Sequence, residues 1–411
     1  MSRRKNILVL TYWSYKEALI QAYTLPYVYI IREQLGRGSK IYLVTFEQKH
    51  LKLTADERSQ VKERLRLKGI RLITLKYKKM SFLSFFYWFF MGFYLWGLVI
   101  FNRINFIHAW CTTAGSIGYM LSKLTGKKLI IDSYEPHAEA MVENKIWQPN
   151  SIPFKLLFYF EKKLSHRAQI IISATAKMRE YAKEKYNVTF DYFYAKPACV
   201  DLKLFSDEVR KDPELVRQFK FEDKIVCVYA GKFGGIYLTT EVFDFFKSCQ
   251  EYWGNKFRVL LLTPHNKEEI YMWCKRSGFD AEKLAIKFIT HEDMPLYMGL
   301  GDFAITPVKP IPTKRYCTPI KDGEYWALGL PIVITKNISD DSDIIEQAGI
   351  GTVLENFRKE DYSKAVQEID ALLQNQDINR LHRKIRDVAS ANRNYSIARK
   401  VYEQVYLNDL R

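Results

Sequence analysis

The segment from Lys321 to Glu324 places a cation and a carboxylate together at the beginning of an expected helix. The two residues are three positions apart, so they share one helical face and the first turn. An ammonium and the positive end of a helix can hold phosphate oxygens, and a carboxylate accepts hydrogen bonds from the vicinal hydroxyls of a ribose. The alternative is an ion pair on the helix surface that binds nothing.

A second candidate is the glycine-containing loop after the apolar run 225–229, which includes Gly231, Lys232 and a Gly-Gly pair. Glycines allow backbone N–H groups to approach a ligand closely, and Lys232 can place an ammonium on a phosphate. The loop matches neither the Walker A pattern nor GxGxxG. A strand-to-helix turn with an exposed lysine is therefore the alternative.

A third group of titratable residues follows the apolar run that ends at Asp132. His137 lies in this group between Glu135 and Glu139. Nearby carboxylates can tune a histidine toward proton transfer at neutral pH. The alternative is a structural histidine at the end of a strand.

The elements that must position these residues form two series of short β-rich runs alternating with helix-length segments. This alternation predicts an α/β fold with two Rossmann-like doubly wound domains facing a cleft. Ligands of such sheets bind outside the carboxyl ends of the strands, so the strand ends that face each other define the site. The expected strands cover 7–11, 41–46, 70–75, 104–109, 129–132 and 170–173 in the first series, and 225–229, 257–262, 285–288, 303–306, 332–334 and 352–354 in the second.

Residues Phe82–Phe101 carry no charge and are long enough to span a bilayer. Strand-like runs precede and follow them, however, and strands of one parallel sheet need a connection that returns to the same side. We therefore expect a crossover helix whose apolar outer face contacts a membrane interface, with flanking lysines and arginines at the headgroups. A helix buried on all sides and a spanning helix are the alternatives.

The segment 318–333 resembles the nucleotide-binding signature of retaining family 4 glycosyltransferases, which have the GT-B fold. Further blocks agree in the right order: 107–110 with Gly115, 161–165 with Ala168, Val200-Asp201 with Leu204-Phe205, and 294–297 with Asp302. The resemblance implies an N-terminal acceptor domain at 1–200 and a C-terminal donor domain at 201–390. It also implies a last helix, 391–411, that packs back on the first domain.

The resemblance also implies roles for individual residues. Lys232 and Lys321, with Gly231, would meet the donor diphosphate, and Glu324 would bind ribose hydroxyls. No metal or other cofactor is expected, because cations at the leaving diphosphate stabilise the charge that grows there. Glu135 and His137 would act in catalysis by orienting acceptor or donor, and the positions assigned to the acceptor or the cleft are Tyr12, Trp13 and His108.

The sequence departs from the family pattern at several places, including Pro197-Ala198-Cys199 before Val200 and Tyr12-Trp13-Ser14 after the first strand, where the family has a glycine-rich turn. The family has two glutamates eight positions apart, and the earlier position here is Tyr316. A second basic residue after Lys232 is also missing, because residues 236–238 are Ile-Tyr-Leu. These departures leave open a divergent donor or a chain without activity.

Composition limits the partners. The chain has 411 residues and a formal net charge of +17, which suits anionic partners such as acidic lipid or a phosphorylated small molecule. No RNA-binding signature or zinc-finger spacing accompanies the charge, so we expect no nucleic acid. Six cysteines without a CxxC pair fit a reducing compartment. The first apolar run is too short for a signal peptide, so we expect a cytoplasmic protein, peripheral at the inner membrane face.

Together these features predict a glycosyltransferase that transfers a sugar, with retention, from a nucleotide-sugar to a lipid-linked or polysaccharide acceptor at the cytoplasmic membrane face. Two alternatives remain: a GT-B sugar-nucleotide epimerase, and a catalytically silent GT-B protein that binds a partner enzyme at the membrane.

Overall fold

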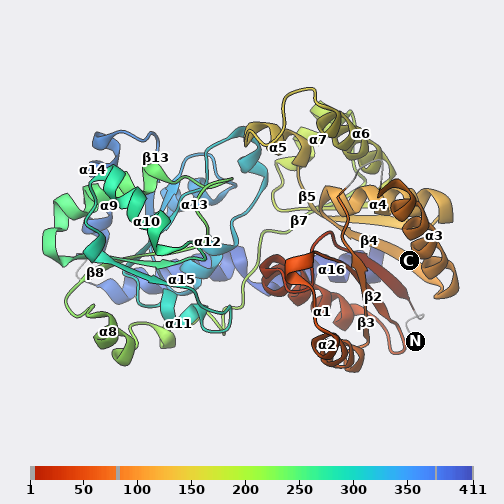
Figure 1. Cartoon of the computed structure of the whole chain (residues 1–411), viewed down its shortest axis with the longest axis horizontal. Coiled ribbons are helices and arrows are strands. Elements are labelled where there is room, and N and C mark those ends of the chain that lie inside the picture. The colour runs from red at the N-terminus through yellow and green to blue at the C-terminus, as the bar shows by residue number, and fades with distance from the viewer. Residues whose placement is uncertain (1–4, 80–83, 375–376, 410–411) are drawn as a thin grey trace. The chain divides into compact units, whose positions relative to one another are not determined.

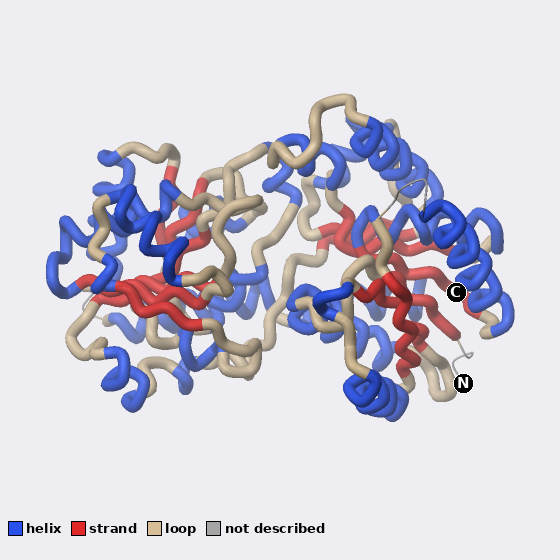
Figure 2. Tube along the Cα trace, viewed as in Figure 1, coloured by secondary structure: helices blue, strands red, loops and turns tan. Residues whose placement is uncertain are grey.

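The computed structural model describes residues 5–79, 84–374 and 377–409. The chain divides into two compact units (Figure 1). Unit 1 comprises Met1–Lys196 with Ser396–Arg411, and unit 2 comprises Pro197–Tyr395. The sequence placed the corresponding boundaries after residues 200 and 390. Each unit is a parallel sheet covered by helices, which Figure 2 shows as red strands between blue helices.

Unit 1 contains a seven-stranded sheet in the order β3-β2-β1-β4-β5-β6-β7, and all its strand pairs are parallel. Its strands are β1 (Asn6–Leu10), β2 (Ile41–Glu47), β3 (Ile70–Lys76), β4 (Ile104–Trp110), β5 (Lys128–Tyr134), β6 (Ile170–Ser173) and β7 (Tyr192–Ala195). Its main helices are α1 (Leu25–Gln34), α2 (Ala55–Leu67), α3 (Phe85–Phe101), α4 (Cys111–Thr125), α5 (His137–Glu143), α6 (Ile152–Arg167), α7 (Met178–Tyr186) and α16 (Tyr395–Glu403).

The central strands of unit 1 are apolar along their whole length because helices cover both faces of the sheet. Every residue of β1 and β2 is buried. The six strands expected for this half are all present. The sequence missed β7, a four-residue strand at the sheet edge whose side chains are half-exposed or exposed, because an edge strand need not carry a continuous apolar run.

The charge-free stretch forms the crossover helix α3 between β3 and β4, as predicted. Phe82 and Leu83 lie outside the described residues. Leu95 and Val99 pack inward and are fully buried, whereas Phe90 and Phe101 are 67% and 83% exposed. The alternative of a helix buried on all sides is therefore wrong. Among the helices that the structure describes, none combines the length and the apolarity needed to cross a membrane.

Unit 2 contains a six-stranded parallel sheet in the order β10-β9-β8-β11-β12-β13. Its strands are β8 (Ile225–Ala230), β9 (Phe257–Leu262), β10 (Leu284–Lys287), β11 (Phe303–Thr306), β12 (Ile332–Thr335) and β13 (Gly351–Leu354). Its helices are α8 (Pro213–Phe219), α9 (Thr240–Trp253), α10 (Lys267–Ser277), α11 (Met294–Met298), α12 (Ile320–Ala327), α13 (Asp341–Ala348), α14 (Lys359–Leu373) and α15 (Ile378–Arg393).

Side chains alternate across the unit 2 sheet and divide its core into two layers. On β8, Val226 and Val228 join a layer that includes Trp326 of α12. Cys227 and Tyr229 of the same strand join the opposite layer with the aromatic residues of α9. Helix α12 is therefore held by its apolar side, which leaves its first turn at the carboxyl end of the sheet.

Candidate functional site

A pocket of about 250 Å³ lies at the carboxyl ends of β8 and β11. These strands are neighbours in the sheet, but the chain runs from β8 outward to β9 and β10 before it returns to β11. The pocket therefore marks the position where the strand order reverses, which is where doubly wound sheets bind ligands. Most of its wall is apolar, and its polar side chains include Lys314, Thr318 and Lys321.

Helix α12 begins at this pocket, which is lined by Pro319, Ile320 and Lys321. Pro319 is the N-cap residue, and no side chain caps the helix. The first N–H groups of α12 thus have no side-chain acceptor and present partial positive charge. An anion at this position would satisfy them.

Two hydrogen bonds fix α12 against the sheet. The Ala230 N–H at the end of β8 donates to the Tyr325 hydroxyl at 2.9 Å, and the Thr306 hydroxyl at the end of β11 donates to Asp322. Gly323 packs so closely that a Cβ there would lie 3.0 Å from Val200 and 3.1 Å from Arg393. The start of α12 is consequently held rigidly beside the pocket.

Lys321 and Glu324 lie together, as the sequence predicts. The Lys321 Nζ is 2.5 Å from the Glu324 Oε2, and the Glu324 side chain is only 2% exposed. Lys321 lines the pocket, whereas Glu324 is not among the lining residues. In this arrangement the carboxylate positions the ammonium and partly neutralises its charge.

The glycine loop forms a neighbouring wall, but Gly231 and Lys232 are not among the pocket-lining residues. Lys232 is exposed, and its carbonyl accepts a hydrogen bond from the Tyr229 hydroxyl. Gly234 has a φ of 76°, which turns the chain so that Ile236 and Tyr237 line the pocket. The loop that the sequence selected therefore contributes apolar contacts instead of a lysine.

Lys314 is a pocket residue that sequence reasoning missed. It lies in a 3₁₀ turn, Pro312–Tyr316, directly before α12, and its side chain is 8% exposed. The sequence does show this lysine two residues before Tyr316, the position at which the family has its first glutamate. A short turn without periodicity, however, does not indicate which side chains point inward.

In unit 1, Glu135 and His137 lie together where β5 leads into α5. The His137 Nδ1 is 3.4 Å from the Glu135 Oε1, and both side chains are about one-third exposed. Beneath them is Glu161 of α6, which is completely buried and accepts a hydrogen bond from the Ala138 N–H at 2.9 Å. Burial raises the pKa of Glu161 to about 7. The sequence included Glu161 in a family block but assigned it no role.

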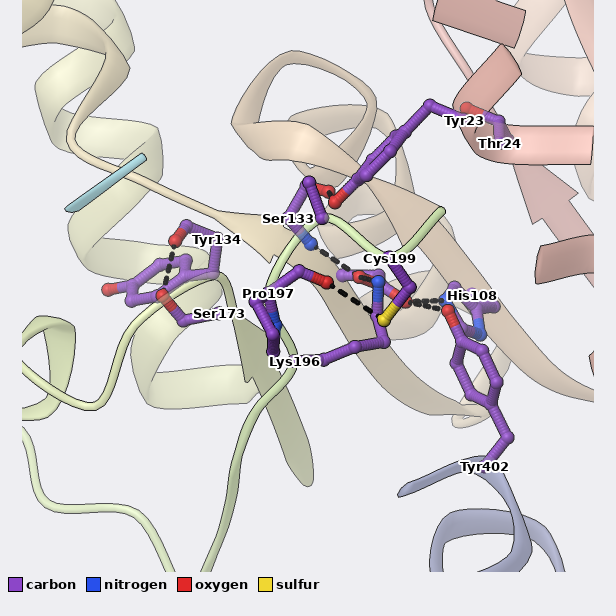
Figure 3. Close-up of polar contacts among 12 residues, drawn as sticks. Tyr23, Thr24, His108, Ser133, Tyr134, Ser173, Lys196, Pro197, Cys199 and Tyr402 are labelled. Atoms are coloured by element: carbon purple, nitrogen blue, oxygen red, sulfur yellow. Dashed lines mark hydrogen bonds and ion pairs between the residues drawn. The ribbon is translucent and has the colours of Figure 1, made fainter. Parts of the chain in front are cut away.

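The assignment of His108 to the acceptor site or cleft does not agree with its position. His108, which Figure 3 labels, is completely buried. Its Nδ1 is 2.5 Å from the Tyr406 hydroxyl, and its Nε2 is 3.3 Å from Asp132. It lies on β4 inside the sheet, where the C-terminal segment covers it. His108 is thus part of the core and cannot contact a ligand in this structure.

Lys196 and Tyr402 complete the buried network around Asp132. The Lys196 Nζ is 3.3 Å from the Asp132 Oδ1, and the Tyr402 hydroxyl donates to the Oδ2 at 2.6 Å (Figure 3). Burial alone would raise the pKa of Asp132, but the Lys196 charge and the hydrogen bonds from His108 and Tyr402 lower it. The network joins the C-terminal helix to the sheet of unit 1.

Tyr12 and Trp13 follow β1 and are half-buried. Tyr12 packs against Phe46 and Tyr77, with ring centroids 5.7 Å from each. Burial raises the pKa of the Tyr12 phenol above its ordinary value. Both residues lie at the carboxyl end of β1, where β1 and β4 form the strand-order reversal of unit 1.

No protein-family model and no curated protein sequence matches the chain. Solved structures match it over almost its full length. A glycosyltransferase from Rickettsia africae has a TM-score of 0.70 at 11% identity and covers 100% of this chain and 99% of its own. HepE from Anabaena in complex with UDP has a TM-score of 0.70 at 12% identity, with 98% and 99% covered. WaaG, a glycosyltransferase involved in lipopolysaccharide biosynthesis, has a TM-score of 0.68 at 13% identity, with 98% and 100% covered.

At these identities the likeness establishes the fold. The chain has the GT-B fold, with two Rossmann-like doubly wound domains, and the fold class predicted from the sequence is confirmed.

Proposed function

We propose that this protein is a glycosyltransferase that takes a sugar from a nucleotide-sugar donor and transfers it, with retention, to a lipid-linked or polysaccharide acceptor. The observation that carries the proposal is the pocket at the β8–β11 strand-order reversal, which combines the uncapped start of α12 with Lys321. Such a combination suits the diphosphate of a donor. The GT-B fold and the UDP and UDP-glucose complexes of HepE support the same choice of ligand.

In this mechanism the bond between the sugar carbon and the diphosphate oxygen breaks as the acceptor oxygen bonds to that carbon. The acceptor proton passes to the leaving phosphate. Negative charge grows on the diphosphate, where the α12 N-terminus and Lys321 stabilise it. Glu135 and His137 orient acceptor or donor, and Lys321 must partly release Glu324 for the carboxylate to reach ribose hydroxyls.

The site test is Glu324→Ala, measured by isothermal titration with nucleoside diphosphates. A charged hydrogen bond to a ribose is worth roughly 1.5–3 kcal/mol, so affinity should fall about tenfold to a hundredfold. Lys321→Ala should lose a similar amount through the diphosphate. Glu355→Ala, which breaks an exposed Lys–Glu pair of the same unit, is the matched control. Wild-type affinity in folded Glu324→Ala would refute the assignment of Glu324, and hydrolysis of no donor in a nucleotide-sugar panel would contradict the activity.

We also propose that unit 1 contacts a membrane surface through α3. Large apolar side chains exposed on this helix are Phe86, Phe89, Phe90, Phe93, Tyr94, Trp96, Ile100 and Phe101. Exposed apolar residues continue onto the neighbouring α4 (Met120, Leu124) and onto α6 (Ile152, Leu156, Tyr159). Exposed cations flank this surface at Lys79, Arg103, Lys123 and Lys155. Aromatic side chains with basic neighbours suit an anionic lipid interface.

Flotation with liposomes tests this surface. Binding should require anionic lipid and weaken with salt, since the Debye length falls to about 10 Å at 0.1 M. Phe90→Ser should reduce binding, whereas Phe288→Ser, which removes a still more exposed phenylalanine from unit 2, should not. Equal binding to neutral and anionic vesicles at every salt concentration would contradict the electrostatic part.

A catalytically silent GT-B protein is the second candidate, and one observation favours it. Tyr316 stands where the family has the first of its two glutamates, at the end of the turn that leads to the pocket. A silent protein need not bind any nucleotide. A screen of nucleoside diphosphates by thermal shift therefore separates the two candidates.

A further inference from the structure

Lys314 carries a charge that the protein itself does not neutralise. Its side chain is 8% exposed and lines the pocket at the carboxyl ends of β8 and β11. Among the described residues, its ammonium takes part in no ion pair and in no side-chain hydrogen bond. The Lys314 Nζ is not among the fully buried side-chain atoms that lack a partner, so the ammonium is open to the pocket that its side chain lines. An anion in the pocket can therefore reach this charge.

The backbone of Lys314 holds the side chain in this position. The Lys314 N–H donates to the Ile311 carbonyl at 2.9 Å, and its carbonyl accepts from the Ser339 N–H at 3.0 Å. The second bond ties the turn to the segment that follows β12. The main chain of Lys314 is therefore held in place beside the pocket that its side chain lines.

Three acidic side chains of α12 and α13 already have partners. Glu324 forms an ion pair with Lys321, and Asp341 forms one with Arg393. Asp322 accepts a hydrogen bond from the Thr306 hydroxyl. Neither an aspartate nor a glutamate lines the pocket. The charge of Lys314 thus faces an apolar pocket in the company of a second lysine and an uncapped helix N-terminus.

We propose that Lys314 binds an anionic group of the donor and is the second cation of the donor pocket. This inference rests on the proposed function. Residues 236–238 carry no basic side chain, although Ile236 and Tyr237 line the pocket. Lys314 supplies a cation to the same pocket from the turn before α12. Its ligand is a phosphoryl oxygen of the diphosphate or a carboxylate on the sugar, both of which pair with an ammonium.

The test is Lys314→Met, which keeps the length of the side chain and removes its charge. Titration with UDP, GDP and ADP should show affinity about tenfold to a hundredfold below wild type for whichever diphosphate binds. Affinity for the corresponding nucleoside should change little. Lys314→Arg should restore most of the diphosphate affinity, and Lys336→Met, which removes an exposed charge from the same unit, should leave it unchanged.

Thermal unfolding of the ligand-free variants supplies a second readout. Because the Lys314 ammonium is open to the pocket, ligand-free Lys314→Met should melt close to wild type, while its stabilisation by the diphosphate shrinks. A lysine with only a structural role would give the opposite result: a lower melting temperature and unchanged affinity. Lys314→Gln provides the same comparison should the methionine variant fail to fold.

The outcomes separate the two proposals. If wild type binds the diphosphate, and Lys314→Met and Lys314→Gln bind both the diphosphate and UDP-glucuronate as tightly as wild type does, the role of Lys314 is overturned and the proposed function stays intact. Binding of no diphosphate by wild type overturns both. Comparison of UDP-glucose with UDP-glucuronate identifies the source of the anion: a loss confined to the glucuronate assigns Lys314 to a sugar carboxylate, and an equal loss assigns it to the diphosphate.

Discussion

Glu161→Gln should make the stability of unit 1 less dependent on pH. Glu161 is fully buried, and burial is the largest cause that raises its pKa to about 7 from an ordinary value of 4.5. Its hydrogen bonds from the Ala138 N–H and the Tyr186 hydroxyl act in the opposite direction. The folded protein therefore keeps a proton on Glu161 at a pH at which the unfolded chain has lost it.

A difference of about 2.5 between the two pKa values corresponds to about 3.4 kcal/mol. Because the folded-state pKa is the higher one, this contribution to stability is fully present below pH 4.5. It is lost as the pH rises through 7, and about 2 kcal/mol of it falls between pH 5.5 and 8.5. Glutamine cannot ionise, and its carbonyl can still accept from the Ala138 N–H.

The free energy of unfolding should be measured from pH 5.5 to 8.5 by urea-dependent hydrogen exchange with mass spectrometry, because this method reads the two units separately. Wild type should lose about 2 kcal/mol more than Glu161→Gln in peptides of β5, α5 and α6. Peptides of unit 2 serve as an internal reference. Glu180→Gln, the same change at an exposed site on α7, should follow wild type. Parallel pH curves for wild type and Glu161→Gln would refute the reasoning.

Two further predictions concern buried contacts. Asp341 pairs with the buried Arg393, and Asp322, whose pKa is raised by burial and by the charge of Asp341, stays protonated beside it. Asp322→Asn should therefore cost little in urea unfolding, whereas Asp341→Asn should cost about 3–5 kcal/mol by leaving the guanidinium unpaired; equal costs would contradict the assignment. Truncation after Asn394 should lower the melting temperature of unit 1 by removing the helix that covers its buried network, and an unchanged transition would show that this helix contributes nothing.

Much of the fold was predictable because local patterns in the sequence determine it. Apolar runs such as β1 and β8 alternate with helix-length segments, and this alternation allows few architectures other than doubly wound sheets. The sequence also predicted that α3 is a crossover helix, because the strands before and after the charge-free stretch belong to one parallel sheet. Lys321 and Glu324 were predictable because a three-residue spacing needs only a helix to bring them together.

Tertiary structure alone decided which side chains face a ligand. Lys232 follows a strand in the expected position but points into solvent, whereas Lys314, in a turn without periodicity, lines the pocket. His108 lies at the expected strand but is covered by Tyr406, which is 298 positions away. Burial and partnership depend on contacts between segments far apart in the chain. The spacing of residues within a short segment does not predict such long-range contacts. The charge that a site presents is therefore determined only after the chain has folded.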